Sequence, residues 1–195
     1  MIADLLKFVA LTHAFQHIQR RNMVPGEDRQ ENDAEHSYQL ASTGWYLVEH
    51  DKLPLNSFKV VTLALCHDLV EVHAGDTFLY AAEETRAPKD KLEKEALEQL
   101  RRDFPEFISM SDLIEEYKER KTAESRFVYA LDKLLPIINN LAEDGRSWQK
   151  SGVTLEQVIA TKREKIAVYP ELSPYFEEII GRMEAQPELF ARKSA

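Results

Sequence analysis

A long stripe of apolar side chains in the second half of the chain constrains the fold more than any other feature. Residues 122–144 read TAESRFVYALDKLLPIINNLAED, and apolar residues recur there at steps of four and three. This spacing places them on one face of an α-helix, which is stable only when other elements cover that face. We therefore expect a core helix with other helices packed around it. The residues of the expected stripe are Phe127, Leu131, Leu134, Ile138 and Leu141.

The rest of the chain shows the same helical period, and no segment has the apolar–polar alternation of a half-buried strand. Residues 20–32 contain a Pro-Gly pair, and residues 145–152 are polar with a glycine at each end, so both are expected to be loops. The predicted fold class is all-α, a compact multi-helix bundle. The expected helices lie within residues 2–19, 33–51, 54–75, 89–104, 113–121 and 122–144, with two more within 154–190.

Composition and charge exclude several classes of protein. The chain is 44% hydrophobic and 30% charged, as soluble globular domains are, and no apolar run is long enough to cross a membrane. A net charge of −9 without a Lys/Arg cluster argues against binding to nucleic acid. The single cysteine, Cys66, cannot form an internal disulfide, and the N-terminus lacks the basic start of a signal peptide. We therefore expect a cytoplasmic protein that binds neither nucleic acid nor membranes.

The stretch LALCHDLVEVHAGD, residues 63–76, begins as an apolar helix and ends in a crowd of polar groups. His67, Asp68 and Glu71 lie within one turn of each other, so they share one side of the helix end. Buried charges are costly unless they are paired or bind a metal. Histidine nitrogens together with carboxylate oxygens suit a divalent metal, with Mn, Co, Zn, Ni, Fe and Mg as candidates. The stretch therefore predicts part of a metal site.

Two further ligands are expected elsewhere in the chain. His36 lies near the start of a helix that Asp33 can cap, in NDAEHSYQLA. Asp132 lies on the flank of the core stripe, where a carboxylate is expensive unless a positive charge meets it. Pro136 cannot donate to the carbonyl of Asp132, so the helix is expected to loosen there. His36, His67-Asp68 and Asp132 would form one metal site between three helices.

The order of these residues resembles that of the HD-domain metal-dependent phosphohydrolases. The motifs AEHS, HDLVEVHAGD and ESRFVYALDKL occur in the family's order, and the similarity is greatest to the branch that contains the 5'-deoxynucleotidases. The resemblance covers about residues 5–145 and implies a single HD-type helical domain over residues 1–195, with the C-terminal helices packed on it. It also implies that His36, His67, Asp68 and Asp132 bind one divalent metal ion, and that the protein is a homodimer.

The resemblance assigns further roles at the site. Glu71 is expected to be catalytic, Asp76 to contact substrate or position water, and Arg21 to hold the phosphate of a small phosphorylated substrate, most simply a nucleoside 5'-monophosphate. The family's aromatic residue beside that arginine, which helps to exclude a ribose 2'-hydroxyl, is replaced by Asn22. Ribonucleotides are therefore expected to be tolerated. Residues 77–87 are a candidate lid over the site.

Alternatives remain at several points. The substrate could be another phosphoester or a pyrophosphate-bearing nucleotide, and a non-catalytic metal-binding domain is the third hypothesis. Intact Glu71 and Asp76 argue against the third, because a structural metal would not need them. Arg20 competes with Arg21 for the role at the phosphate. His13 and His17 are four residues apart but lack the glutamate of a zinc-peptidase motif, so no second metal is expected there.

Overall fold

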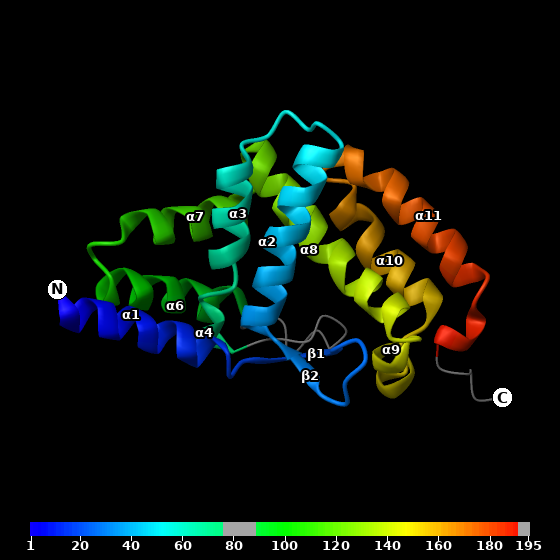
Figure 1. Cartoon of the computed structure of the whole chain (residues 1–195), viewed down its shortest axis with the longest axis horizontal. Coiled ribbons are helices and arrows are strands. Elements are labelled where there is room, and N and C mark those ends of the chain that lie inside the picture. Colours follow the sequence, from blue (N-terminus) through cyan, green and yellow to red (C-terminus); the bar gives the residue numbers. More distant parts are fainter. Residues whose placement is uncertain (76–88, 191–195) are drawn as a thin grey trace.

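The structure is a computed structural model, and it describes residues 1–75 and 89–190. Helices dominate this part of the chain, with one small antiparallel hairpin beside them (Figure 1). The predicted all-α class is therefore confirmed. The α-helices are α1 (Ile2–Phe15), α2 (Asp33–His50), α3 (Ser57–Cys66), α4 (Glu71–Ala74), α6 (Lys89–Asp103), α7 (Ile108–Glu119), α8 (Ala123–Ala142), α9 (Arg146–Ser151), α10 (Leu155–Ile166) and α11 (Ser173–Glu184). Two 3₁₀ turns, η1 (Pro170–Leu172) and η2 (Pro187–Leu189), and two strands, β1 (Gln19–Met23) and β2 (Gln30–Asn32), complete the described elements.

The central helix is α8, as the apolar stripe predicts. Its N-terminus is capped by the Thr122 hydroxyl, which accepts a hydrogen bond from the backbone of Ser125. Most of the expected stripe is buried, whereas Ile138 is 37% exposed. The helix is continuous through Pro136, so the loosening expected near Asp132 does not interrupt it.

Two hydrophobic clusters hold the helices together. The larger cluster joins α2, α3, α8, α10 and α11, and the smaller cluster joins α1, α6 and α7 to the end of α3. In Figure 1, α1, α6 and α7 lie on one side of α2, α3 and α8, and α10 and α11 lie on the other. The functional stretch that follows α3 lies where the two clusters meet. Among the described helices, none combines the length and apolarity needed to span a membrane.

The hairpin is a correction to the predicted loop over residues 20–32, and α1 ends at Phe15 instead of running to residue 19. Strands β1 and β2 pair antiparallel, with Gln19 opposite Asn32 and Met23 opposite Gln30. The strands are short, and their inward side chains include charged ones, so they show no apolar alternation. Tertiary contacts, rather than local pattern, stabilise this hairpin.

Two other boundaries differ from prediction. The helix expected over residues 54–75 is broken, because α3 ends at Cys66 and α4 begins at Glu71. Between them the chain tightens, with hydrogen bonds from Leu69 N to Cys66 O at 3.1 Å and from Glu71 N to Asp68 O at 2.8 Å. The loop expected over residues 145–152 contains the short helix α9. The two expected C-terminal helices are present as α10 and α11.

Candidate active site

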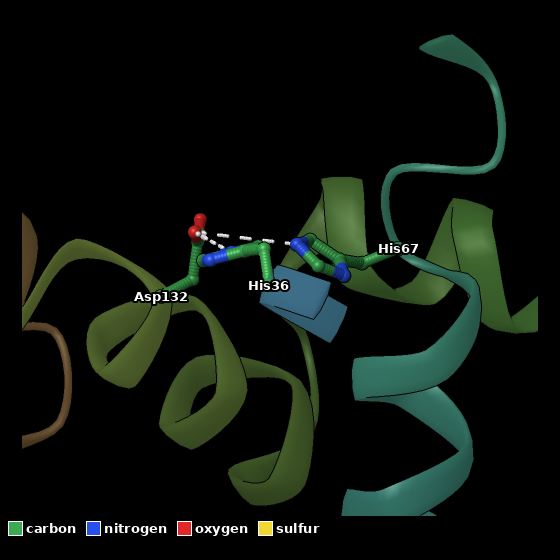
Figure 2. Close-up of side chains that lie close together, drawn as sticks. All are labelled: His36, His67 and Asp132. Atoms are coloured by element: carbon green, nitrogen blue, oxygen red, sulfur yellow. Dashed lines mark hydrogen bonds and ion pairs between the residues drawn. The ribbon is translucent and has the colours of Figure 1, made fainter. Parts of the chain in front are cut away.

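Three buried side chains from separate parts of the chain meet beside α8. His36 comes from the first turn of α2, His67 from the turn after α3, and Asp132 from the middle of α8 (Figure 2). His36 Nε2 lies 3.1 Å from Asp132 Oδ1, and His67 Nε2 lies 4.0 Å from the same oxygen. None of the three residues is more than 3% exposed. They form a group of possible metal ligands whose donor atoms lie within 4.8 Å of one another.

A capping box places His36. The Asn32 side chain accepts from the backbone of Glu35, and the Glu35 side chain accepts from the backbone of Asn32, so α2 begins at Asp33. The cap is therefore Asn32 and not Asp33, which was the expected cap. Asp33 is instead fully buried and turns toward the site. His36, one residue beyond this box, faces the core from the first turn.

The orientation of the His67 ring leaves Nε2 as the nitrogen that can bind a cation. Nδ1 lies 2.8 Å from the carbonyl oxygen of Ala64, which can only accept, so Nδ1 carries the proton and donates. In the neutral ring, Nε2 then presents a lone pair. That atom is buried and lies 3.0 Å from Asp68 Oδ2; burial lowers the pKa of the ring, but the charge of Asp68 outweighs burial and raises it. Two electron-rich atoms that face each other in the interior are stabilised by a cation between them.

The carboxylate of Asp132 is held from its other side. Tyr117 Oη donates to Asp132 Oδ2 at 2.6 Å, and Lys133 Nζ bonds the same oxygen. Burial alone would raise the pKa of Asp132, but Lys133 and His36 outweigh burial and hold the pKa well below its usual value. Asp132 is therefore a carboxylate, and its Oδ1 faces the two histidines.

A second group of acids lies beside the first, around one arginine. Asp33, Asp68 and Glu71 bring carboxylate oxygens within 4.8 Å of one another. Arg20 Nη1 lies 2.8 Å from Asp33 Oδ1 and 3.0 Å from Asp68 Oδ2. Burial raises the pKa of Asp33 to about 6 in spite of this arginine. Glu31 lies 3.8 Å from the same guanidinium, and burial raises its pKa to about 7. The acids outnumber the cation they share.

These residues fit one divalent cation. Ligand atoms bound to one ion at about 2.1 Å lie about 3.0–3.4 Å apart, and here the separations are 3.0 Å for His67–Asp68, 3.1 Å for His36–Asp132 and 4.0 Å for His67–Asp132. The donors are imidazole nitrogens and carboxylate oxygens, which suit a divalent transition metal. A cation would also offset the surplus of buried acids. Asp68 lies at the edge of the histidine group, because its Oδ2 is shared between His67 and Arg20.

The other residues expected at the site are Glu71, Arg21, Asn22 and Asp76. Glu71 opens α4, is 4% exposed and hydrogen-bonds Asp33. Arg21 is exposed on β1, whereas its neighbour Arg20 reaches the acids. Asn22 Oδ1 accepts from Asn140 Nδ2 on α8 at 3.4 Å. Asp76 and the expected lid of residues 77–87 lie outside the described part of the chain.

Three residues that contact the candidate site were not predicted from the sequence. Tyr117 and Lys133 hold Asp132, and Glu31 lies 3.9 Å from His36 Nδ1. The run of acids just before His36, GluAsnAspAlaGlu over residues 31–35, was a signal that a cation lies nearby. No comparable signal marked the tyrosine. His13 and His17 are exposed and belong to no group of possible metal ligands among the described residues.

Comparison with known proteins agrees with this geometry. A family model described as HD domain matches residues 13–173. The 5'-deoxynucleotidase HDDC2 of Bos taurus is 33% identical over 133 residues, which is 67% of this chain and 63% of that protein. The protein of the same name from Xenopus laevis is 31% identical over 141 residues, 71% of this chain and 68% of that protein. The match thus spans less than two thirds of the bovine relative.

Solved structures show the same arrangement of helices. A predicted metal-dependent phosphohydrolase from Magnetospirillum magnetotacticum has a TM-score of 0.84 and 30% identity, and the match covers 98% of this chain and 96% of that one. A conserved hypothetical protein from Pyrococcus furiosus has a TM-score of 0.64 and 24% identity, with 92% and 99% covered, and shares the fold. The resemblance drawn from the motifs is confirmed. Because the family model matches most of its length, the chain belongs to the HD domain family.

Proposed function

We propose that this protein is a metal-dependent phosphohydrolase that releases phosphate from nucleoside 5'-monophosphates. The observation that carries the proposal is the buried meeting of His36, His67 and Asp132, with the Nε2 of His67 3.0 Å from Asp68 Oδ2 and 4.0 Å from Asp132 Oδ1. The names of the relatives, a 5'-deoxynucleotidase and a predicted metal-dependent phosphohydrolase, support the substrate class.

The proposed ligands of a single divalent ion are His36, His67, Asp68 and Asp132. Such an ion polarises a phosphoryl oxygen and lowers the pKa of a nearby water. The hydrogen bond from His67 Nδ1 to Ala64 fixes the ring, and Tyr117 and Lys133 fix the carboxylate of Asp132. The ligand atoms are thereby held in place before an ion binds.

Glu71 is the proposed acid–base residue. It is buried, and its carboxyl group lies beside those of Asp33 and Asp68, with oxygens of all three within 4.8 Å of one another. From there its carboxylate orients the attacking water and takes the proton that the water loses. Asp76 is proposed to contact substrate or to position the same water.

Two neighbouring arginines are proposed to have different roles at the site. Arg20 balances Asp33 and Asp68, to which it is bonded, and so keeps these acids ionised. Arg21, exposed on the same strand, is proposed to grip the substrate phosphate with two parallel hydrogen bonds. Asn22 is proposed to form part of the sugar pocket, with its amide held by Asn140.

The decisive experiment is a substrate screen. The metal-reconstituted protein is offered ribo- and deoxyribonucleoside mono-, di- and triphosphates, and both phosphate and pyrophosphate are measured. Release of phosphate from monophosphates, lost in the variant His67→Ala, is the expected result. Release of pyrophosphate would instead support the second substrate class. If the fully metal-loaded protein hydrolyses none of these nucleotides, the result would support the third hypothesis, a metal-binding domain without catalytic activity.

We also propose that the protein is a cytoplasmic homodimer. The outer face of α2 exposes Tyr38, Trp45 and Tyr46, and an open hollow is lined there by Ser42, Trp45, Tyr46, Glu49 and His50. Exposed aromatic side chains gathered on one helix are typical of protein interfaces. Light scattering of the wild type and of Trp45→Glu tests this: a dimer that becomes a monomer supports the α2 face, and an unchanged mass excludes it.

A further inference from the structure

The helix α10 places a lysine in the middle of its buried stripe. Val158, Lys162 and Ile166 are spaced four residues apart, so they share the face that packs against α8. Val158 and Ile166 are fully buried, and Lys162 is only 6% exposed. A lysine is almost never buried to this extent unless an acid pairs with it, because its ammonium loses its hydration.

No acid among the described residues forms an ion pair with Lys162. Other cations near α8 are paired: Lys133 with Asp132, and Arg20 with Asp33 and Asp68. Within residues 1–75 and 89–190, Lys162 makes neither a hydrogen bond nor an ion pair. Burial, followed by repulsion from Lys133, lowers the pKa of Lys162 to about 7. Lys162 is therefore a largely buried lysine that has no ion-pair partner within the described part of the chain.

The electrostatic environment of Lys162 is set in part by residues of the candidate active site. The charges that act on Lys162 include Lys133 and Asp132 on α8, and Arg20 on β1. Helices α8 and α10 lie side by side in Figure 1 and pack against each other. Lys133 and Lys162 together leave a surplus of positive charge on this side of Asp132. A dianion that entered here would supply the missing counter-charge.

We propose that Lys162 is a phosphate-binding residue of the substrate site, whose ammonium bonds a non-bridging oxygen of a phosphomonoester. The proposal rests on the proposed phosphohydrolase function. It adds a residue that lies outside both the hairpin and the group formed by His36, His67 and Asp132. An ammonium suits this role as a point charge with three donors. It follows that the C-terminal helices complete the substrate site instead of only covering the core.

The variant Lys162→Met tests the proposal, because methionine keeps the length and apolar stem of the side chain and removes the charge. Loss of one charge-assisted hydrogen bond should raise the KM for a nucleoside monophosphate about 10- to 100-fold, with a smaller effect on kcat. Inhibition by inorganic phosphate should weaken by a similar factor. The matched control is Lys94→Met, which removes one charge from an exposed position on α6 and should leave both constants unchanged.

A purely structural role would give a different pattern. In that case Lys162→Met would shift the melting temperature while KM and phosphate inhibition stayed at wild-type values, and the proposal would be overturned. Lys162→Arg, which keeps the charge, should bind phosphate more tightly than Lys162→Met does.

Calorimetric titration of inorganic phosphate into the metal-loaded protein separates this inference from the proposed function. If the wild type hydrolyses no nucleotide but binds phosphate more tightly than Lys162→Met, Lys162 is an anion site and the proposed function fails. If nucleotides are hydrolysed and the two proteins bind phosphate equally, the function stands and the role of Lys162 fails. A wild type that binds no phosphate also overturns the role of Lys162.

Discussion

Replacing Asp132 by alanine removes a carboxylate that three side chains approach. Tyr117 Oη donates to it at 2.6 Å, Lys133 Nζ bonds the same oxygen, and His36 Nε2 lies 3.1 Å from the other. Removing one partner of a buried ion pair costs about 3–5 kcal/mol, because the other charge is left in the interior. The side chain of Lys133 is 25% exposed and can recover part of its hydration, so we expect about 3 kcal/mol, at the lower end.

Thermal unfolding in the presence of a chelator measures this cost without a contribution from metal. Domains of this size change in melting temperature by about 2–4 °C for each kcal/mol, so Asp132→Ala should melt about 6–12 °C below the wild type. The control is Glu71→Gln in the same buffer, for which we expect a change below about 2 °C, because glutamine keeps the shape of the side chain. A comparably small change for Asp132→Ala would refute the reasoning that Asp132 is an ionised, paired carboxylate.

The effect of Asp132→Ala should also depend on pH. Burial raises the pKa of Asp132, but Lys133 and His36 lower it further, and the folded value lies well below the ordinary one. A carboxyl group of this kind stabilises the fold above its unfolded pKa of about 3.9, and that stability is lost as the pH falls toward the folded value. The difference between wild type and Asp132→Ala should therefore be complete at neutral pH and shrink below about pH 4.

Three further predictions concern the metal, the acid–base residue and the sugar. Exhaustive chelation should abolish turnover and lower the melting temperature together, since metal binding is coupled to folding; unchanged values of both would exclude a metal site. Glu71→Gln should keep its metal, measured by elemental analysis, and lose about 10²- to 10⁴-fold in turnover; loss of the metal would make Glu71 a ligand. Ribo- and deoxyribonucleoside monophosphates should have kcat/KM values within about tenfold of each other, and Asn22→Trp should favour the deoxy form; a strong deoxy preference in the wild type would place the sugar wall elsewhere.

The apolar period of the sequence was sufficient to predict a helix where the residues of that segment alone decide its structure. The stripe in residues 122–144 predicted α8, and the charged amphipathic run over residues 89–104 predicted α6. In both segments the apolar period of a helix is present in consecutive residues, and burial of that face is its main source of stability. The motifs around His36, His67 and Asp132 likewise placed the metal group before any geometry was known, and the structure brings these three together.

The hairpin and the break after α3 were beyond the reach of local pattern. Strands β1 and β2 have no apolar face, and their inward charged residues are stable because of groups far along the chain. Arg20 meets Asp68 across 48 positions, and Glu31 meets Asn139 across 108. The turn at residues 67–70 likewise interrupts a sequence that is helical by period, and the buried contacts of His67 accompany that turn.

Pairing of buried charges was the other property that only the tertiary structure decided. Nothing in the sequence indicated that Arg20 would pair with Asp33 and Asp68, and the prediction that Arg21 holds the phosphate stays a prediction. The sequence by itself determined the helical class and predicted His36, His67 and Asp132 as metal ligands, because helical period and ligand type are properties of short segments. The tertiary structure decided which cation meets which acid, and within residues 1–75 and 89–190 it left Lys162 largely buried without an ion pair, because the free energy of a buried charge depends on every group packed around it.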